Sequence, residues 1–245
     1  MDVINYEDLV FPPGPFYDGK GSFGKINKCW LNNDTYAYKE FHNPGFLTSK
    51  IRKINLIGKI DEPFIVVPKF FVEKKGTKSG YLTRFVNGKD LISQNEATGI
   101  EERIKLLRMA KQQIQAMHQK YNLIHGDISG CNIMIEKMNT VFIDFDNSTY
   151  AGYKTNSNDA NDLAIDFIKA YGICKELDIF LLNILTFEII NNVGRDLVGA
   201  EINAHRFGAF TSTDSRRILA STLLCEKYPT SDFLIDTIDE TTIKK

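Results

Sequence analysis

The feature that most constrains this chain is a loop sequence that carries Asp127 and, five residues later, Asn132, with apolar residues on both sides. A further aspartate, Asp144, closes the short apolar run of residues 141–143. A plain turn can also contain Asp, Asn and Gly. The apolar residues on both sides, however, indicate that this segment lies in a core, and a carboxylate buried in a core is costly without a cation. Magnesium-dependent phosphoryl transfer needs these groups: one carboxylate to orient a hydroxyl, and an amide and a second carboxylate to hold the metal.

Three glycines near the N-terminus, Gly19, Gly21 and Gly24, fit the pattern G-x-G-x-x-G and precede the β-branched Ile26. Glycines at this spacing let the backbone of a hairpin approach phosphates, with amide N–H groups pointing at the oxygens. A glycine-rich turn with no such function has the same appearance. The dinucleotide-binding version of the motif requires a helix after the glycines, whereas residues 26–31 look like a strand. We therefore expect a phosphate-covering hairpin, in which Ser22 also binds the nucleotide.

A lysine, Lys39, lies in the second of two predicted strands, residues 26–31 and 35–41, which flank the turn Asn32-Asn33-Asp34. A lysine in a strand that faces a core is costly unless its ammonium meets a negative partner. On an edge strand it would be an ordinary surface residue. Its position downstream of the glycines favours a contact with the α- and β-phosphates of a nucleotide.

The chain changes character near residues 85–88. Before this point we predict a β-rich part with strands over residues 64–72 and 81–86 and one helix over residues 47–60, capped by Thr48 or Ser49. After it, helical periodicity begins with residues 100–120. The expected fold class is therefore α+β, with a β-rich N-lobe over residues 1–86 and a mainly helical C-lobe over residues 87–245.

The strand that leaves the β-rich part continues into a turn at Gly88. As a hinge, its backbone groups at Thr83, Arg84, Phe85 and Val86 would bind an adenine edge, and the following aspartate would lie near a ribose hydroxyl. That aspartate is Asp90. As a plain linker, the segment would have no role in binding.

Two histidines, His118 and His125, lie seven residues apart and precede the Asp127 loop. No third metal ligand is suggested nearby, so neither indicates a metal site. We expect both side chains to be buried and hydrogen-bonded, with His125 supporting the backbone of the loop.

Composition narrows the class of protein. The chain of 245 residues has a formal net charge of -1, which provides no field for binding nucleic acid or an anionic membrane. Its four cysteines show no paired spacing and indicate a reducing compartment. The N-terminus lacks an apolar signal core, and the longest apolar run, residues 179–190, is too short to span a bilayer. We expect a cytoplasmic protein, while export by a route without a cleaved signal peptide stays open.

The motifs in this order resemble the eukaryotic-type protein kinases and their relatives over about residues 16–170. The resemblance implies a bilobal fold, with one kinase-like domain over about residues 16–245, and ATP and Mg²⁺ as cofactors. It implies that Asp127 orients the acceptor hydroxyl, that Asn132 and Asp144 hold Mg²⁺, and that Lys39 steadies the ATP phosphates beneath the glycines. A protein substrate with a hydroxyl acceptor follows from the same resemblance.

The chain departs from the family pattern at residues that position the strand lysine and regulate activity. The helix of residues 47–60 lacks the glutamate that pairs with the strand lysine, and Lys53 lies near that place. Lys39 then needs another partner, for which Asp144 is a candidate. Gly126 replaces the arginine that reads a phosphorylated activation loop, and Asp146 replaces the glycine of the Asp-Phe-Gly motif.

The segment that positions a peptide substrate is short. Asp162 resembles the buried aspartate that opens the next helix, and no Ala-Pro-Glu string lies between it and Asp144.

Three functions fit these patterns. His-Gly-Asp with a trailing Asp-Phe-x-Asp also resembles the aminoglycoside and choline phosphotransferases, whose large helical insertion this chain lacks. The missing helix glutamate is typical of a non-catalytic pseudokinase or docking module, although Lys39, Asp127, Asn132 and Asp144 are intact. The ordered glycine loop favours a small, atypical serine/threonine protein kinase. Oligomeric state and acceptor identity are not specified by the sequence.

Overall fold

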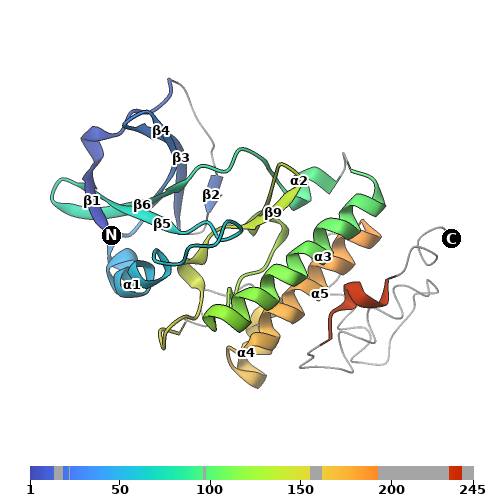
Figure 1. The fold of residues 1–245 in the computed structure, drawn as a ribbon. Coiled ribbons are helices and arrows are strands. Elements are labelled where there is room, and N and C mark those ends of the chain that lie inside the picture. Colours follow the sequence, from blue (N-terminus) through green and yellow to red (C-terminus); the bar gives the residue numbers. More distant parts are fainter. Residues whose placement is uncertain (14–18, 22, 96–97, 155–161, 193–231, 239–245) are drawn as a thin grey trace. The chain divides into compact units, whose positions relative to one another are not determined.

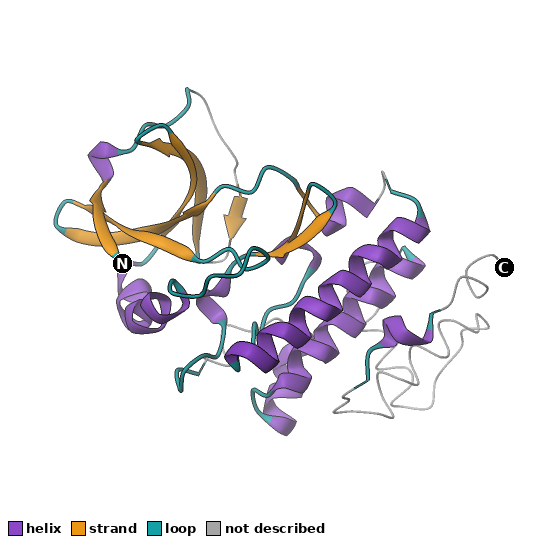
Figure 2. Ribbon diagram, in the orientation of Figure 1, coloured by secondary structure: helices purple, strands orange, loops and turns teal. Residues whose placement is uncertain are grey.

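A computed structural model describes residues 1–13, 19–21, 23–95, 98–154, 162–192 and 232–238 of the chain. The chain forms two compact units. The N-terminal unit comprises residues 1–87 and 142–146, and the C-terminal unit comprises residues 88–141 and 147–245. Strands dominate the first unit and helices the described part of the second (Figures 1 and 2). The class is α+β, as predicted.

The N-terminal unit is built on a six-stranded sheet in the order β1-β5-β6-β4-β3-β2. Its strands are β1 (Asp2–Asn5), β2 (Gly19–Gly21), β3 (Gly24–Leu31), β4 (Asp34–Phe41), β5 (Pro68–Lys74) and β6 (Thr77–Arg84). The β1–β5 pair is parallel and the other pairs are antiparallel. The predicted β3–β4 hairpin is confirmed. Its turn places Asn32 and Asn33 at φ +51° and +70°, a conformation that asparagine tolerates and that suits the twist of a hairpin.

The remaining strands differ from their predicted bounds. β5 and β6 form a tight hairpin at Lys75-Gly76, so most of the expected loop between them is strand. Residues 64–67, predicted as the start of a strand, lie outside β5, and Ile65 forms an isolated bridge with Phe142. The N-terminal residues, where no strand was predicted, form β1 alongside β5.

The helix α1 (Pro44–Ile57) begins and ends earlier than predicted. The side chain of Asn43 accepts a hydrogen bond from the Gly45 N–H at 2.9 Å, and Pro44 occupies the first turn, which its fixed φ suits. Thr48 and Ser49 were wrong as caps, since their hydroxyls donate to carbonyls inside the helix.

One face of the sheet packs against α1. The buried side chains there come from the helix and from β4, β5 and β6: Phe41, Leu47, Ile54, Phe71 and Tyr81. A second apolar cluster contains side chains of β3 to β6: Cys29, Leu31, Tyr38, Val72 and Leu82. The sheet is therefore rigidly held where Lys39 and Tyr81 project from it.

The C-terminal unit is mainly helical. Its helices are α2 (Leu91–Asn95), α3 (Ile100–Ala116), α4 (Asp162–Tyr171) and α5 (Lys175–Asn191), and α3 continues into a π-helical turn, Met117–Tyr121. A small sheet contains β7 (Lys89–Asp90), which precedes α2, and β8 (Ile133–Glu136) and β9 (Asn139–Phe142), which follow the Asp127 loop. α5 packs against α3 and is buried along most of its length. No helix in the described part of the chain is long and apolar enough to cross a membrane.

Candidate active site

The glycine motif forms the predicted hairpin. β2 and β3 are antiparallel with Gly21 opposite Gly24, and Ser22 lies outside the described residues. Ile26 pairs with Gly19 on one side and with Lys39 on the other. A Cβ atom on Gly24 would lie 2.3 Å from the carbonyl oxygen of Glu40 in β4. Gly24 is therefore required by the close approach of two strands, whatever its role toward phosphates.

An aromatic contact joins the turn of this hairpin to α1. The Phe23 ring stacks on the Phe46 ring with centroids 4.7 Å apart and planes 7° from parallel. The Lys50 ammonium lies 3.6 Å from the Phe46 ring centroid, within cation–π range. The glycine-rich hairpin is thus held by the helix, a contact that the sequence analysis did not predict.

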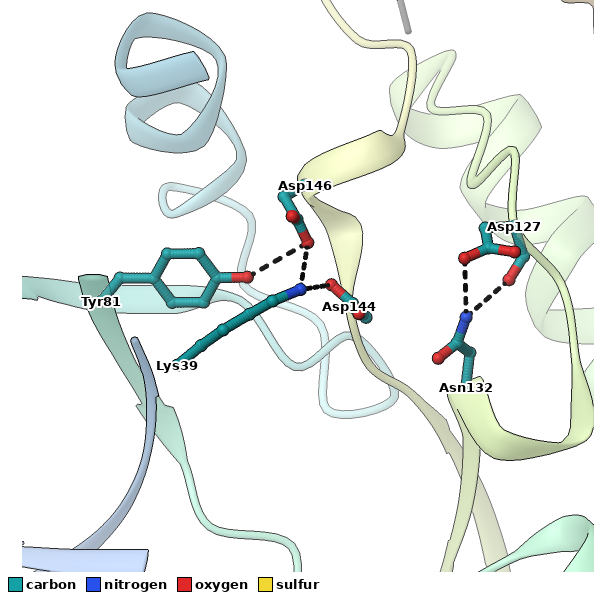
Figure 3. Close-up of polar contacts among 6 residues, drawn as sticks. All are labelled: Lys39, Tyr81, Asp127, Asn132, Asp144 and Asp146. Atoms are coloured by element: carbon teal, nitrogen blue, oxygen red, sulfur yellow. Dashed lines mark hydrogen bonds and ion pairs between the residues drawn. The ribbon is translucent and has the colours of Figure 1, made fainter. Parts of the chain in front are cut away.

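Lys39 projects from β4 into a cluster of acidic groups (Figure 3). Its ammonium forms ion pairs with Asp144 and with Asp146, the latter at 2.8 Å. The Tyr81 hydroxyl donates a hydrogen bond to the same Asp146 oxygen at 3.3 Å. The candidate partner Asp144 is thus in contact with Lys39. Asp146, for which the sequence suggested no contact with Lys39, is a second partner.

One cation between two carboxylates sets the electrostatics of this cluster. Burial lowers the pKa of Lys39, but Asp144 and Asp146 outweigh it and leave that pKa well above its ordinary value. Burial and the charge of Asp146 raise the pKa of Asp144 to about 8. Burial also acts to raise the pKa of Asp146, but Lys39 outweighs it and lowers the value. Lys39 therefore stays protonated beside the two carboxylates.

The two carboxylates differ in exposure. The Asp144 side chain is 30% exposed and that of Asp146 is 1% exposed. Asp144 follows β9 with φ +65°, a left-handed conformation that aspartate adopts more readily than most residues and that is common at functional sites. The Oδ2 atom of Asp146 is buried and has no hydrogen-bond partner in the described part of the chain. Asp144 is therefore the carboxylate that an incoming cation can approach.

The loop of the C-terminal unit joins Asp127 to Asn132 (Figure 3). The Asn132 amide nitrogen donates hydrogen bonds to the backbone oxygen of Asp127 at 2.9 Å and to its carboxylate at 3.1 Å. The nitrogen is thereby fixed on Asp127, and the amide oxygen makes no hydrogen bond with the residues that the structure describes. This arrangement orients one carboxylate and offers one oxygen to a cation.

A buried aspartate, Asp178, holds this loop from the first turn of α5. Its carboxylate accepts hydrogen bonds from the backbone N–H groups of His125 at 2.9 Å and Gly126 at 2.8 Å. The same carboxylate contacts the His118 ring nitrogen Nε2 at 2.8 Å. Gly126 has φ +78°, which favours glycine. Both histidines are buried and hydrogen-bonded, as predicted, and the His125 Nδ1 accepts the Asp127 N–H at 3.3 Å.

The aspartate that holds the loop was not predicted. Asp162, which resembles the buried aspartate that opens the next helix, is the first residue of α4, and its side chain is outside the part that the structure describes. Asp178 went unnoticed because its partners lie more than fifty residues away in the sequence. The available signal was an aspartate directly before the long apolar run that begins at Ile179.

The family model of the protein kinase domain matches residues 19–201, three quarters of the chain. The chain belongs to the protein kinase family. The match begins at the first glycine of the hairpin motif and includes Lys39, Asp127, Asn132 and Asp144. A comparison with curated proteins found no match.

The kinase domain lacks the usual carboxylate on its N-terminal helix. α1 contains no acidic residue, and the residue near the expected position, Lys53, is a buried lysine with 3% exposure. Both described carboxylate partners of Lys39 come instead from residues 144–146. In this kinase domain the lysine is therefore held by the segment that follows β9.

The predicted adenine-binding segment lies at the end of β6. Thr83 and Arg84 pair with β4, and the Phe85 N–H donates to the Thr35 carbonyl at 3.4 Å. Val86 is buried. The Phe85 N–H is thus used within the N-terminal unit, and adenine binding by the backbone of Thr83, Arg84, Phe85 and Val86 stays a prediction.

Asp90, the residue predicted to contact a ribose, has a structural partner in the kinase domain. Its carboxylate accepts hydrogen bonds from the Ser93 N–H at 2.8 Å and the Ser93 hydroxyl at 2.6 Å. This is the pattern of a helix cap at the start of α2. The ribose contact stays a prediction.

Proposed function

We propose that this kinase domain is an ATP- and Mg²⁺-dependent phosphotransferase that acts on hydroxyl groups of proteins, as a small, atypical serine/threonine kinase. The observation that supports it best is the ion pair between Lys39 and Asp144. A buried lysine beside a partly exposed aspartate that follows a strand is the arrangement that can serve a metal-bound triphosphate. The ordered Asp127–Asn132 pair supports the same function.

On this proposal each group has one task. Lys39 neutralises the α- and β-phosphates, and Gly19, Gly21 and Gly24 cover them with backbone N–H groups. Asp127 orients the acceptor hydroxyl and accepts its proton.

The proposed metal ligands are the Asn132 amide oxygen and the Asp144 carboxylate. Mg²⁺ characteristically uses one or two protein oxygens together with substrate phosphates and water. In the described part of the chain no cluster of three or more His, Cys, Asp or Glu side chains is arranged to hold a metal by itself. The donor set thus fits magnesium that arrives with a nucleotide, and the ion would neutralise charge on the phosphates.

The first test is transfer of radiolabelled phosphate from ATP. The chain is incubated with Mg²⁺, with a generic protein substrate in one series and a panel of aminoglycosides and amino alcohols in another. We expect label on protein and none on the small molecules. Label on a small molecule alone would instead place the chain with the small-molecule kinases.

A non-catalytic kinase-like module is the second candidate, and the absence of an acidic residue from α1 favours it. Thermal unfolding with and without Mg²⁺·ATP distinguishes the two. A ligand at 100 times its Kd stabilises the folded state by about 2.7 kcal/mol. No shift at millimolar nucleotide would support the module.

A further inference from the structure

The position of Asp146 suggests a role beyond the groups named above. In the related protein kinases a glutamate on the N-terminal helix pairs with the strand lysine, and here α1 has no acidic residue. We propose that Asp146 is the positioning residue that holds Lys39 for the nucleotide phosphates, in place of that glutamate. The inference rests on the proposed function and names a residue in the same site.

Contacts within the N-terminal unit support this role. Asp146 accepts the Lys39 ammonium at 2.8 Å and the Tyr81 hydroxyl at 3.3 Å through the same oxygen. Tyr81 is buried between the sheet and α1, so its hydroxyl is fixed. A 3-10 turn, Phe145–Asn147, fixes the backbone of Asp146. Lys39, Tyr81 and Asp146 thus form a small network with little freedom to move (Figure 3).

Exposure distinguishes the tasks of the two aspartates. Asp144 is 30% exposed and is the proposed metal ligand, so a bound magnesium ion would compete with Lys39 for its carboxylate. Asp146 is 1% exposed and stays beside Lys39. When metal and nucleotide are both bound, Asp146 is therefore the anion that keeps the ammonium in place.

The helix contributes the opposite charge, because the residue near the place of the usual glutamate is the buried Lys53. The usual arrangement, with an anion on the helix and glycine after the metal-binding aspartate, is replaced by a cation on the helix and an aspartate at the glycine position. Lys39 is thus positioned by the metal-binding segment and needs no carboxylate from α1.

The test uses the full chain and measures binding of ADP and adenosine by calorimetry in EDTA, where the metal makes no contribution. Asp146→Asn keeps the shape and removes the charge, which leaves Lys39 bound to Asp144 alone. We expect ADP affinity to fall about tenfold, equivalent to about 1.4 kcal/mol. Adenosine affinity should not change, because it lacks the phosphates that Lys39 contacts.

Asp166→Asn in α4 is the matched control, with the same chemical change at a 65% exposed side chain. It leaves the contacts of Lys39 intact, so ADP affinity in EDTA should be unchanged. The assignment of Asp146 as the positioning residue would be overturned if both variants lowered ADP affinity equally. Loss of adenosine binding by Asp146→Asn would also overturn it. Tyr81→Phe removes one donor to Asp146 and keeps every charge. It should lower the affinity for ADP about two- to threefold. This variant replaces Asp146→Asn in the test if Asp146→Asn does not fold.

A chemical readout separates this inference from the proposed function. In the nucleotide-free chain, amine acetylation followed by mass spectrometry should modify Lys39 several-fold faster in Asp146→Asn than in the parent, with the exposed Lys59 as internal reference. A parent chain that binds no nucleotide would refute the proposed function, and acetylation would still test the contact. An unchanged Lys39 rate would overturn the inference.

Discussion

Replacing Asp178 by asparagine tests how the Asp127 loop is held. Its carboxylate serves three donors, the N–H groups of His125 and Gly126 and the His118 ring. An amide presents one oxygen where the carboxylate presents two, so at least one buried donor loses its acceptor. Such a loss costs about 1–3 kcal/mol, and hydrogen bonds to charged groups are worth about 1.5–3 kcal/mol each. We therefore expect Asp178→Asn to lower the free energy of unfolding by about 3 kcal/mol.

The assay is thermal unfolding followed by circular dichroism. In a chain of this length each kcal/mol shifts Tm by about 2–4 °C, so Tm should fall by about 6–12 °C. Hydrogen exchange supplies local detail, because the amides of His125 and Gly126 should exchange faster in the variant.

The matched control is Asp166→Asn in α4. Asp166 has a 65% exposed side chain and a distant pair with Lys169 at 4.0 Å. Its replacement should change the free energy of unfolding by less than about 0.5 kcal/mol. The reasoning is refuted if Asp178→Asn and Asp166→Asn have the same Tm, or if the exchange of the two loop amides stays as slow as in the parent.

Three further outcomes follow from the structure. Cys131 is exposed, whereas Cys29 is buried and burial raises its thiol pKa to about 11. Maleimide labelling at neutral pH, measured by peptide mass spectrometry, should therefore modify Cys131 before Cys29. Gly24→Ala places a methyl group against the Glu40 carbonyl and should lower the free energy of unfolding, measured with urea, by about 1–3 kcal/mol. An unchanged urea midpoint would contradict the close contact between the two strands. Asp144→Ala should remove the magnesium-dependent part of ATP binding measured by calorimetry, and metal-independent ATP affinity in the parent would argue against that metal site.

Local sequence signals predicted the parts of the fold that local physics determines. Asn32 and Asn33 specify a tight turn, and the glycine motif before a strand specifies a hairpin. Apolar residues at helical spacing indicate α3, and a long apolar run corresponds to α5. The family resemblance follows from the order of the motifs, which a sequence displays directly.

Contacts between distant residues could not be predicted in the same way. β1 is four residues long and largely exposed, and it is a strand because β5 lies beside it. Asp178 carries no motif of its own, and its role depends on donors in a loop far away in the sequence. The sequence shows Asp146 in place of a glycine, but the role of Asp146 depends on its contacts with the polar atoms of Lys39 and Tyr81.

The central claim is that Asp127 orients a hydroxyl for transfer of phosphate from magnesium-bound ATP. The most direct measurement compares the parent with Asp127→Ala, each mixed with radiolabelled ATP and host lysate, and identifies phosphorylated proteins by mass spectrometry while calorimetry follows Mg²⁺·ATP binding. The account predicts protein phosphorylation that depends on the parent chain and is absent with the variant, at nearly equal nucleotide affinity. Equal phosphorylation by both chains, or loss of nucleotide binding together with turnover, would contradict it.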